Sequence, residues 1–182
     1  MENYNLEQDV FNWLEAAGFE QDNPTMHETA INGFWSEIGE TMLAYNQSNK
    51  SEVLDGVVDS YWMLQNMRFF GVDIRTRIFC KSELYNTEYF CNFGHTAFTD
   101  SEIRRYQKAV SISNWSRFCK NEAEAKATVT AYYFGSHPDK PNKKIPTLYK
   151  QVGEKWVVYH EQSRKVLKSI NYITVQDALK TL

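Results

Sequence analysis

Two pairs of acidic residues lie at helical spacing and could carry out chemistry together. Glu37 and Glu40 are three residues apart, and Asp55 and Asp59 are four apart. At these spacings each pair falls on one face of a helix, and Glu52 extends the second group by a further turn. Two antiparallel helices would bring the two pairs together. Carboxylates held so close repel one another, so such a cluster requires water, protons or cations.

A hard divalent cation is the simplest solution to this repulsion. Mg²⁺ prefers carboxylate oxygens and water in octahedral geometry, and it readily bridges to the phosphate groups of a substrate. We therefore expect Glu37, Glu40, Asp55 and Asp59 to bind Mg²⁺, with Mn²⁺ as a second candidate. The inferred chemistry is phosphate chemistry, with Glu37, Glu40 and Asp59 as the catalytic candidates and Glu40 as the candidate base.

The alternative interpretation is that these acids only form a solvated helix face, because ExxE and DxxxD spacings occur on many soluble helices. Two features favour a site. Gly39 and Gly56 lie inside the predicted helices beside the acids, and a glycine within a helix indicates close approach by another backbone or a ligand. Asp59 is followed by an apolar run at residues 61–64, which predicts that it projects into a mostly buried bundle.

The elements that would position these acids follow from the hydrophobic periodicity. One predicted apolar stripe contains Ile31, Phe34, Ile38 and Met42, and Ser51 is the expected cap of the helix after it. The Thr99-Asp-Ser-Glu102 stretch predicts another cap. Helices are expected at residues 6–17, 25–46, 51–70 and about 99–113, and the good helix formers Ala, Glu and Lys predict another at residues 121–134.

The predicted fold class is an all-α four-helix bundle with a small β-hairpin appendage near the C-terminal end. The hairpin is expected from residue 147 to residue 160, with its turn at Gly153-Glu154. Residues 72–101 contain scattered aromatics without a sustained period and are interpreted as an irregular insertion. With 182 residues, the chain is expected to form one domain over residues 1–182.

Composition excludes several classes of protein. Hydrophobic residues make up 42% and charged residues 24%, which are globular values, and the formal net charge of −3 disfavours a dedicated nucleic-acid binder. No apolar run is long enough to span a bilayer and no signal peptide is recognised, so we expect a cytoplasmic protein without a membrane partner. Three cysteines, Cys80, Cys91 and Cys119, are an odd number, which argues against a disulfide framework.

An ordered set of motifs resembles the phage-type MazG-like all-α nucleoside triphosphate pyrophosphohydrolases, which are themselves similar to phosphoribosyl-ATP pyrophosphohydrolase. The set covers most of the chain outside residues 72–101. Its four parts are Trp35-Ser-Glu37-Ile-Gly-Glu40, Glu52-Val-Leu-Asp55-Gly-Val-Val-Asp59, Ile112-Ser-Asn114-Trp-Ser-Arg117-Phe and Lys165-Val-Leu-Lys168-Ser-Ile-Asn-Tyr172.

The resemblance implies a Mg²⁺-dependent enzyme that cleaves a nucleoside triphosphate to the monophosphate and pyrophosphate. It assigns metal binding to the four acids already identified. It also implies a C-terminal segment, residues 147–182, that covers the substrate, and at least a dimer. The residues matched to substrate binding are Asn114, Arg117, Lys165, Lys168 and Tyr172.

Two alternatives stay open from the sequence. One is hydrolysis of a different nucleotide, either phosphoribosyl-ATP or guanosine tetraphosphate. The other is a catalytically inactive helical phage protein that binds a host partner, which the aromatic insertion favours.

Overall fold

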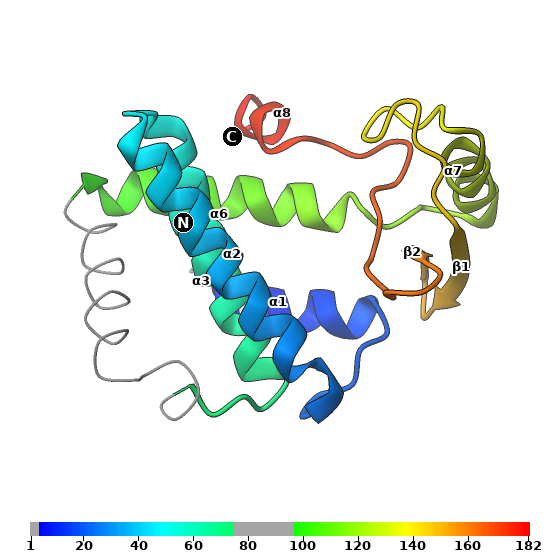
Figure 1. Cartoon of the computed structure of the whole chain (residues 1–182), viewed down its shortest axis with the longest axis horizontal. Helices are drawn as coiled ribbons and strands as arrows, with labels where there is room; N and C mark the ends of the chain where they lie inside the picture. The colour runs from blue at the N-terminus through cyan, green and yellow to red at the C-terminus, as the bar shows by residue number, and fades with distance from the viewer. Residues whose placement is uncertain (1–3, 75–96) are drawn as a thin grey trace. The chain divides into compact units, whose positions relative to one another are not determined.

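The computed structural model describes residues 4–74 and 97–182 (Figure 1). In this part of the chain, six α-helices and a short 3₁₀ helix accompany a single two-stranded antiparallel sheet. The prediction of a mostly helical protein with a small β-hairpin is therefore confirmed. None of the helices in the described ranges is both long enough and apolar enough to cross a membrane.

The chain divides into two compact units. Unit 1 comprises residues 1–15 and 19–110 together with Leu182, and unit 2 comprises residues 16–18 and 111–181. The predicted acids all belong to unit 1, whereas all five predicted substrate-binding residues belong to unit 2. Each unit is described by itself below, and the single domain over residues 1–182 stays a prediction.

Unit 1 is built on a pair of long antiparallel helices, α2 and α3, which lie side by side in Figure 1. Aromatic rings from the first helix pack edge-on against the second long helix, with ring centroids 6.2 Å apart for Trp13 and Trp62 and 5.3 Å apart for Phe11 and Phe69. The helices of this unit are α1 (Leu6–Ala16), η1 (Pro24–Met26), α2 (His27–Asn46), α3 (Lys50–Phe69) and the first part of α6 (Asp100–Trp115).

The hydrogen bonds at the N-terminal ends of two helices can be compared with the predicted caps. Thr99 is confirmed as a cap of α6, because its Oγ1 accepts a hydrogen bond from the Glu102 amide while a Glu102 carboxylate oxygen accepts one from the Thr99 amide. Ser51 is not the cap of α3. The Asn49 side chain accepts a hydrogen bond from the Glu52 amide at 3.4 Å, so the helix starts earlier than predicted.

The expected insertion at residues 72–101 lies mostly outside the described residues, as do Cys80 and Cys91. Its last two residues belong to α6, which begins at Asp100.

The predicted apolar stripe of α2 is correct except at its end. Ile31, Phe34 and Ile38 are buried, but Met42 is 51% exposed. The fully buried position in that turn belongs to Thr41, which packs against Gly56 of α3. Because successive helix residues are about 100° apart, the side chain that follows Thr41 turns towards solvent.

Unit 2 combines the end of α6 with α7 (Glu122–Phe134), the strands β1 (Thr147–Val152) and β2 (Lys155–His160), and the short helix α8 (Val175–Leu179). The strands pair antiparallel, with Tyr149 opposite Val158, and Gly153 supplies the positive φ of 56° at the turn. The predicted hairpin is therefore confirmed. Cys119, Ala125 and Val158 form a buried cluster beneath it, whereas α8 was not predicted.

Candidate functional site

Two close contacts define how α2 and α3 are aligned. A methyl group added at Gly56 would overlap the Thr41 side chain and lie 3.2 Å from the Thr41 Cα atom. A methyl group added at Gly33 would overlap the end of the Met63 side chain. The predicted close approach at Gly56 is thus confirmed and is made by a neighbouring helix. At Gly39 no other backbone approaches within residues 4–74 and 97–182, where nothing lies within 4 Å of the position a methyl group would take; a ligand there stays a prediction.

This alignment brings the two predicted acid pairs to the same stretch of the helix pair. Counting along antiparallel helices from these two contacts puts Glu37 at the level of Asp59 and Glu40 at the level of Asp55. Glu37, Asp55 and Asp59 are half-buried, and Glu40 is exposed. Acids 15 or more residues apart in the sequence therefore occupy one region of unit 1.

The electrostatic surroundings of Asp55 disfavour its ionisation. Burial raises its pKa, and the negative charges of Glu52 and Glu40 raise it further. A hydrogen bond with Tyr106 of α6 acts in the opposite direction without cancelling the rise. Burial, and then the charge of Asp55, raise the pKa of the Tyr106 hydroxyl in turn. Sequence reasoning did not identify Tyr106 as a partner of the acids.

The acidic side chains are not arranged around a common point. Over residues 4–74 and 97–182, no group of three or more His, Cys, Asp or Glu side chains has an arrangement that could hold a metal ion. The fit to Mg²⁺ lies in the donor chemistry and in the shared level along the helices. The pKa of Asp55 is raised first by burial and then by the charges of Glu52 and Glu40, which agrees with this fit. To share one ion, the carboxylates would have to turn towards one another, and the metal site stays a prediction.

The structure brings four of the five predicted substrate-binding residues together in unit 2. The Arg117 guanidinium carbon lies 5.7 Å from the centroid of the Tyr172 ring, and the Lys168 ammonium lies 4.5 Å from it. Asn114 accepts a hydrogen bond of 3.0 Å from Arg117 Nε, and the Tyr172 hydroxyl shares one of 2.6 Å with Ser113. We call Arg117, Lys168 and Tyr172 the basic group. Two cations around one aromatic ring suit a polyanionic ligand.

Lys165 does not join the basic group in the contacts that the structure shows. Its side chain is exposed, and its backbone carbonyl accepts a hydrogen bond from the His160 amide at the end of β2. Its proposed contact with substrate stays a prediction.

Asp139 is a residue that sequence reasoning missed. It accepts a hydrogen bond of 2.6 Å from Lys168 Nζ, in a pair whose side chains are only 27% (Lys168) and 21% (Asp139) exposed. Burial opposes ionisation of Asp139, but the Lys168 ammonium outweighs it, so the pKa of the carboxyl is lowered. The available signal was that Asp139 is the one acid in the lysine-rich stretch 135–146.

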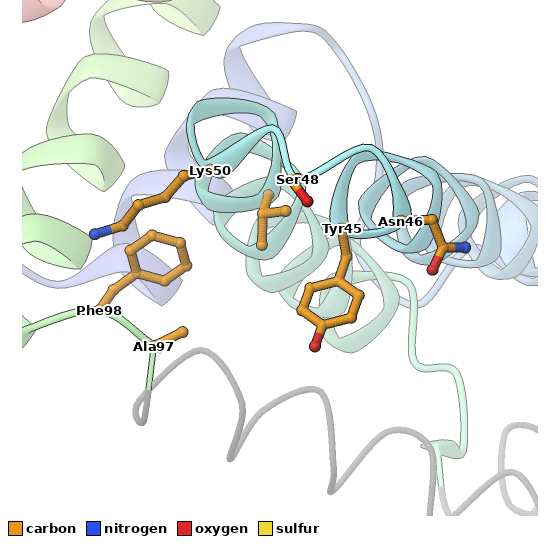
Figure 2. Close-up of a pocket in the computed structure, with 7 residues that line it drawn as sticks. Tyr45, Asn46, Ser48, Lys50, Ala97 and Phe98 are labelled. Atoms are coloured by element: carbon orange, nitrogen blue, oxygen red, sulfur yellow. The ribbon is translucent and has the colours of Figure 1, made fainter.

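A separate pocket lies at the connection between α2 and α3 (Figure 2). Tyr45, Ser48, Lys50 and Phe98 help to line it, and the Lys50 ammonium lies 5.4 Å from the centroid of the Phe98 ring. None of the predicted site residues lines this pocket. Its wall continues at Ala97, which directly follows the residues that the structure does not describe, and we assign it no ligand.

Comparison with known proteins found no matching family model, no matching curated protein and no matching solved structure.

Proposed function

We propose that this chain is a Mg²⁺-dependent nucleoside triphosphate pyrophosphohydrolase that forms the monophosphate and pyrophosphate. The observation that carries the proposal is the alignment of α2 with α3, in which the Thr41–Gly56 contact puts Glu37 level with Asp59 and Glu40 level with Asp55. An accumulation of negative charge at one stretch of a helix pair is costly unless a cation relieves it. The raised pKa of Asp55 supports this assignment.

The basic group supports the choice of substrate. A triphosphate carries more negative charge than one divalent ion neutralises, so additional cations are needed to bind it. Arg117 and Lys168 supply two such cations beside the Tyr172 ring. In this proposal they bind phosphate oxygens through charge-assisted hydrogen bonds, and Asn114 orients the Arg117 guanidinium.

In the proposed chemistry, the acids of α2 and α3 serve two purposes. Bound Mg²⁺ would neutralise phosphate charge and favour ionisation of the attacking water. Asp55 and Asp59 would act as ligands, and Glu37 and Glu40 would contribute further carboxylates. Glu40 is exposed, so it is accessible to a water molecule and is the proposed base that accepts its proton.

The fold proposed with this function is a MazG-like core of four helices, in which α1, α2, α3 and the first part of α6 take part. The proposed compartment is the cytoplasm, and the proposed assembly is at least a dimer. Exposed apolar side chains on α2 support self-association, since Met42, Leu43 and Tyr45 are each more than half exposed.

The test is the release of pyrophosphate from a panel of nucleotides in the presence of Mg²⁺. The panel includes ribo- and deoxyribonucleoside triphosphates, phosphoribosyl-ATP and guanosine tetraphosphate, so the alternative substrates are distinguished directly. Glu40→Gln and Asp59→Asn should each abolish hydrolysis while the protein stays folded. The matched control is Glu15→Gln, which removes one charge from an exposed position on α1. Wild-type turnover in both site variants would show that the acids only form a solvated helix face.

A further inference from the structure

Lys168 is held from several sides in unit 2. Its ammonium donates to the Asp139 carboxylate at 2.6 Å and lies 4.5 Å from the centroid of the Tyr172 ring. Its backbone carbonyl accepts a hydrogen bond of 3.2 Å from the Tyr132 hydroxyl. The cation proposed to bind phosphate is therefore already paired with an anion of the protein.

Asp139 is fixed in place by its neighbours. The buried His137 ring stacks on Tyr132, with ring centroids 3.9 Å apart and an angle of 6° between the rings. Its Nδ1 atom accepts a hydrogen bond of 3.2 Å from the Asp139 amide. Since Tyr132 also bonds to the backbone of Lys168, both partners of the ion pair are tied to the same aromatic stack. The carboxylate therefore stays at Lys168 at little entropic cost.

We propose that Asp139 sets the affinity of the basic group for polyphosphate by competing with phosphate oxygens for the Lys168 ammonium. The inference rests on the proposed function, because it takes Lys168 to be a phosphate-binding residue. It adds a residue that determines how tightly substrate and product are held.

The competition follows from charge. Carboxylate and phosphate oxygens accept the same kind of short, charge-assisted hydrogen bond from an ammonium group. An arriving phosphate must either displace Asp139 from Lys168 or bind next to a second anion in a partly buried environment, where repulsion is poorly screened. Both outcomes weaken binding. Without the Asp139 charge, the net positive charge of Arg117 and Lys168 would act on the ligand in full.

The experiment measures binding of inorganic tripolyphosphate by isothermal titration calorimetry in metal-free buffer, so it does not depend on hydrolysis. Asp139→Asn removes the charge but keeps the shape of the side chain and an oxygen that can accept from Lys168. We expect this variant to bind tripolyphosphate about tenfold more tightly than the wild type, as expected for one charge-assisted contact. Lys168→Ala should weaken binding by a similar factor. Adding Asp139→Asn to Lys168→Ala should change the Kd by less than about twofold, because the residue competed for is gone.

The matched control is Asp177→Asn, which removes the same charge from an exposed ion pair with Lys180 in the same unit. It should leave the Kd within about twofold of the wild type. A folded Asp139→Asn protein that binds tripolyphosphate no more tightly than the wild type would overturn the inference alone. If Lys168→Ala binds as the wild type does, the phosphate-binding role of Lys168 in the proposed function fails as well. Asp139→Ser is the second neutral variant. If neither neutral variant folds, Asp139 is a stability residue and the inference is overturned.

Discussion

Two aspartates of this protein show how the surroundings of a side chain set its proton affinity. Asp55 is half-buried near Glu52 and Glu40, and burial together with these negative charges raises its pKa. Asp139 is also partly buried, yet the Lys168 ammonium lowers its pKa. Ionisation of Asp55 therefore destabilises the folded state, whereas ionisation of Asp139 stabilises it.

Asp55→Asn should stabilise the protein at neutral pH. A carboxyl whose pKa is raised by folding destabilises the folded state once the pH exceeds the pKa in the unfolded chain, about 3.9. Asparagine removes that charge and can still accept a hydrogen bond from Tyr106. The free energy of unfolding should increase by at least about 0.2–0.5 kcal/mol, which is the cost of one like-charge pair on a helix. Thermal unfolding at pH 7 and at pH 3 measures it, and the gain should vanish at pH 3. A lower melting temperature at pH 7 would contradict the prediction.

Asp139→Asn should have the opposite effect. A carboxyl whose pKa is lowered by folding stabilises the folded state above its pKa in the unfolded chain, and this contribution is lost as the pH falls through the folded pKa. The variant should therefore melt below the wild type at pH 7, and the difference should shrink at acid pH. The same pair of thermal unfolding measurements checks this sign, with Asp177→Asn as the exposed control. Equal melting temperatures at pH 7 would show that the Lys168–Asp139 pair contributes no net stability.

At the scale of elements, Gly56 is one of two glycines at which α2 and α3 pack closely. Gly56 leaves room for Thr41, whose side chain is fully buried and donates a hydrogen bond of 2.6 Å to the Glu37 carbonyl. This contact holds the helix carrying Glu40 against the helix carrying Asp55. The same packing that stabilises unit 1 thus determines how near the acids are.

Gly56→Ala and Gly39→Ala should change stability in opposite directions. The added methyl group at Gly56 overlaps Thr41, so the variant should lose about 1–3 kcal/mol through overpacking. At Gly39 the added methyl group meets nothing within 4 Å in the part of the chain that the structure describes, and alanine should gain about 0.5–1 kcal/mol from better helix propensity. Chemical denaturation of both variants measures the difference. Combining Gly56→Ala with Thr41→Ala should recover part of the loss. A neutral Gly56→Ala variant would contradict the alignment inferred for the two helices.

At the scale of the whole molecule, residues of opposite charge are divided between the two units. The acids proposed to bind metal belong to unit 1, and Arg117 and Lys168 belong to unit 2. With a net charge of −3 the chain as a whole does not attract polyanions, so phosphate binding has to come from a local group of cations.

Millimolar Mg²⁺ or Mn²⁺ should raise the melting temperature. A cation that binds the acids only in the folded state stabilises it by an amount that grows with concentration, about 2.7 kcal/mol at 100 times the Kd. Melting curves with and without metal, at matched ionic strength, measure the shift. Glu40→Gln and Asp59→Asn should reduce it, while Glu15→Gln should not. An unchanged melting temperature in the wild-type protein would count heavily against a metal site at these acids.

The amino-acid sequence by itself determined the local structure. Apolar spacing predicted four of the six described helices to within a few residues, and helix propensity predicted a fifth at residues 121–134, because periodicity, propensity and capping depend on neighbours in the chain. Thr99 with Glu102 and the turn at Gly153 are local signals of this kind, and both were recognised. Residue type and spacing also pointed to the four acids, and the motif resemblance pointed to all three residues of the basic group; their roles stay predictions.

Only the tertiary structure decided which residues meet across long separations. Asp139 and Lys168 are 29 residues apart, and their pairing depends on how the stretch at residues 135–146 packs within unit 2. Gly39 and Gly56 both lie inside helices beside the acids, yet of these two only Gly56 closely approaches a neighbouring helix among the described residues. Met42 was expected to be buried from its spacing, but it is exposed because Thr41 makes the contact with α3 in that turn. Such contacts arise from the alignment of one element against another, and local spacing does not encode that alignment.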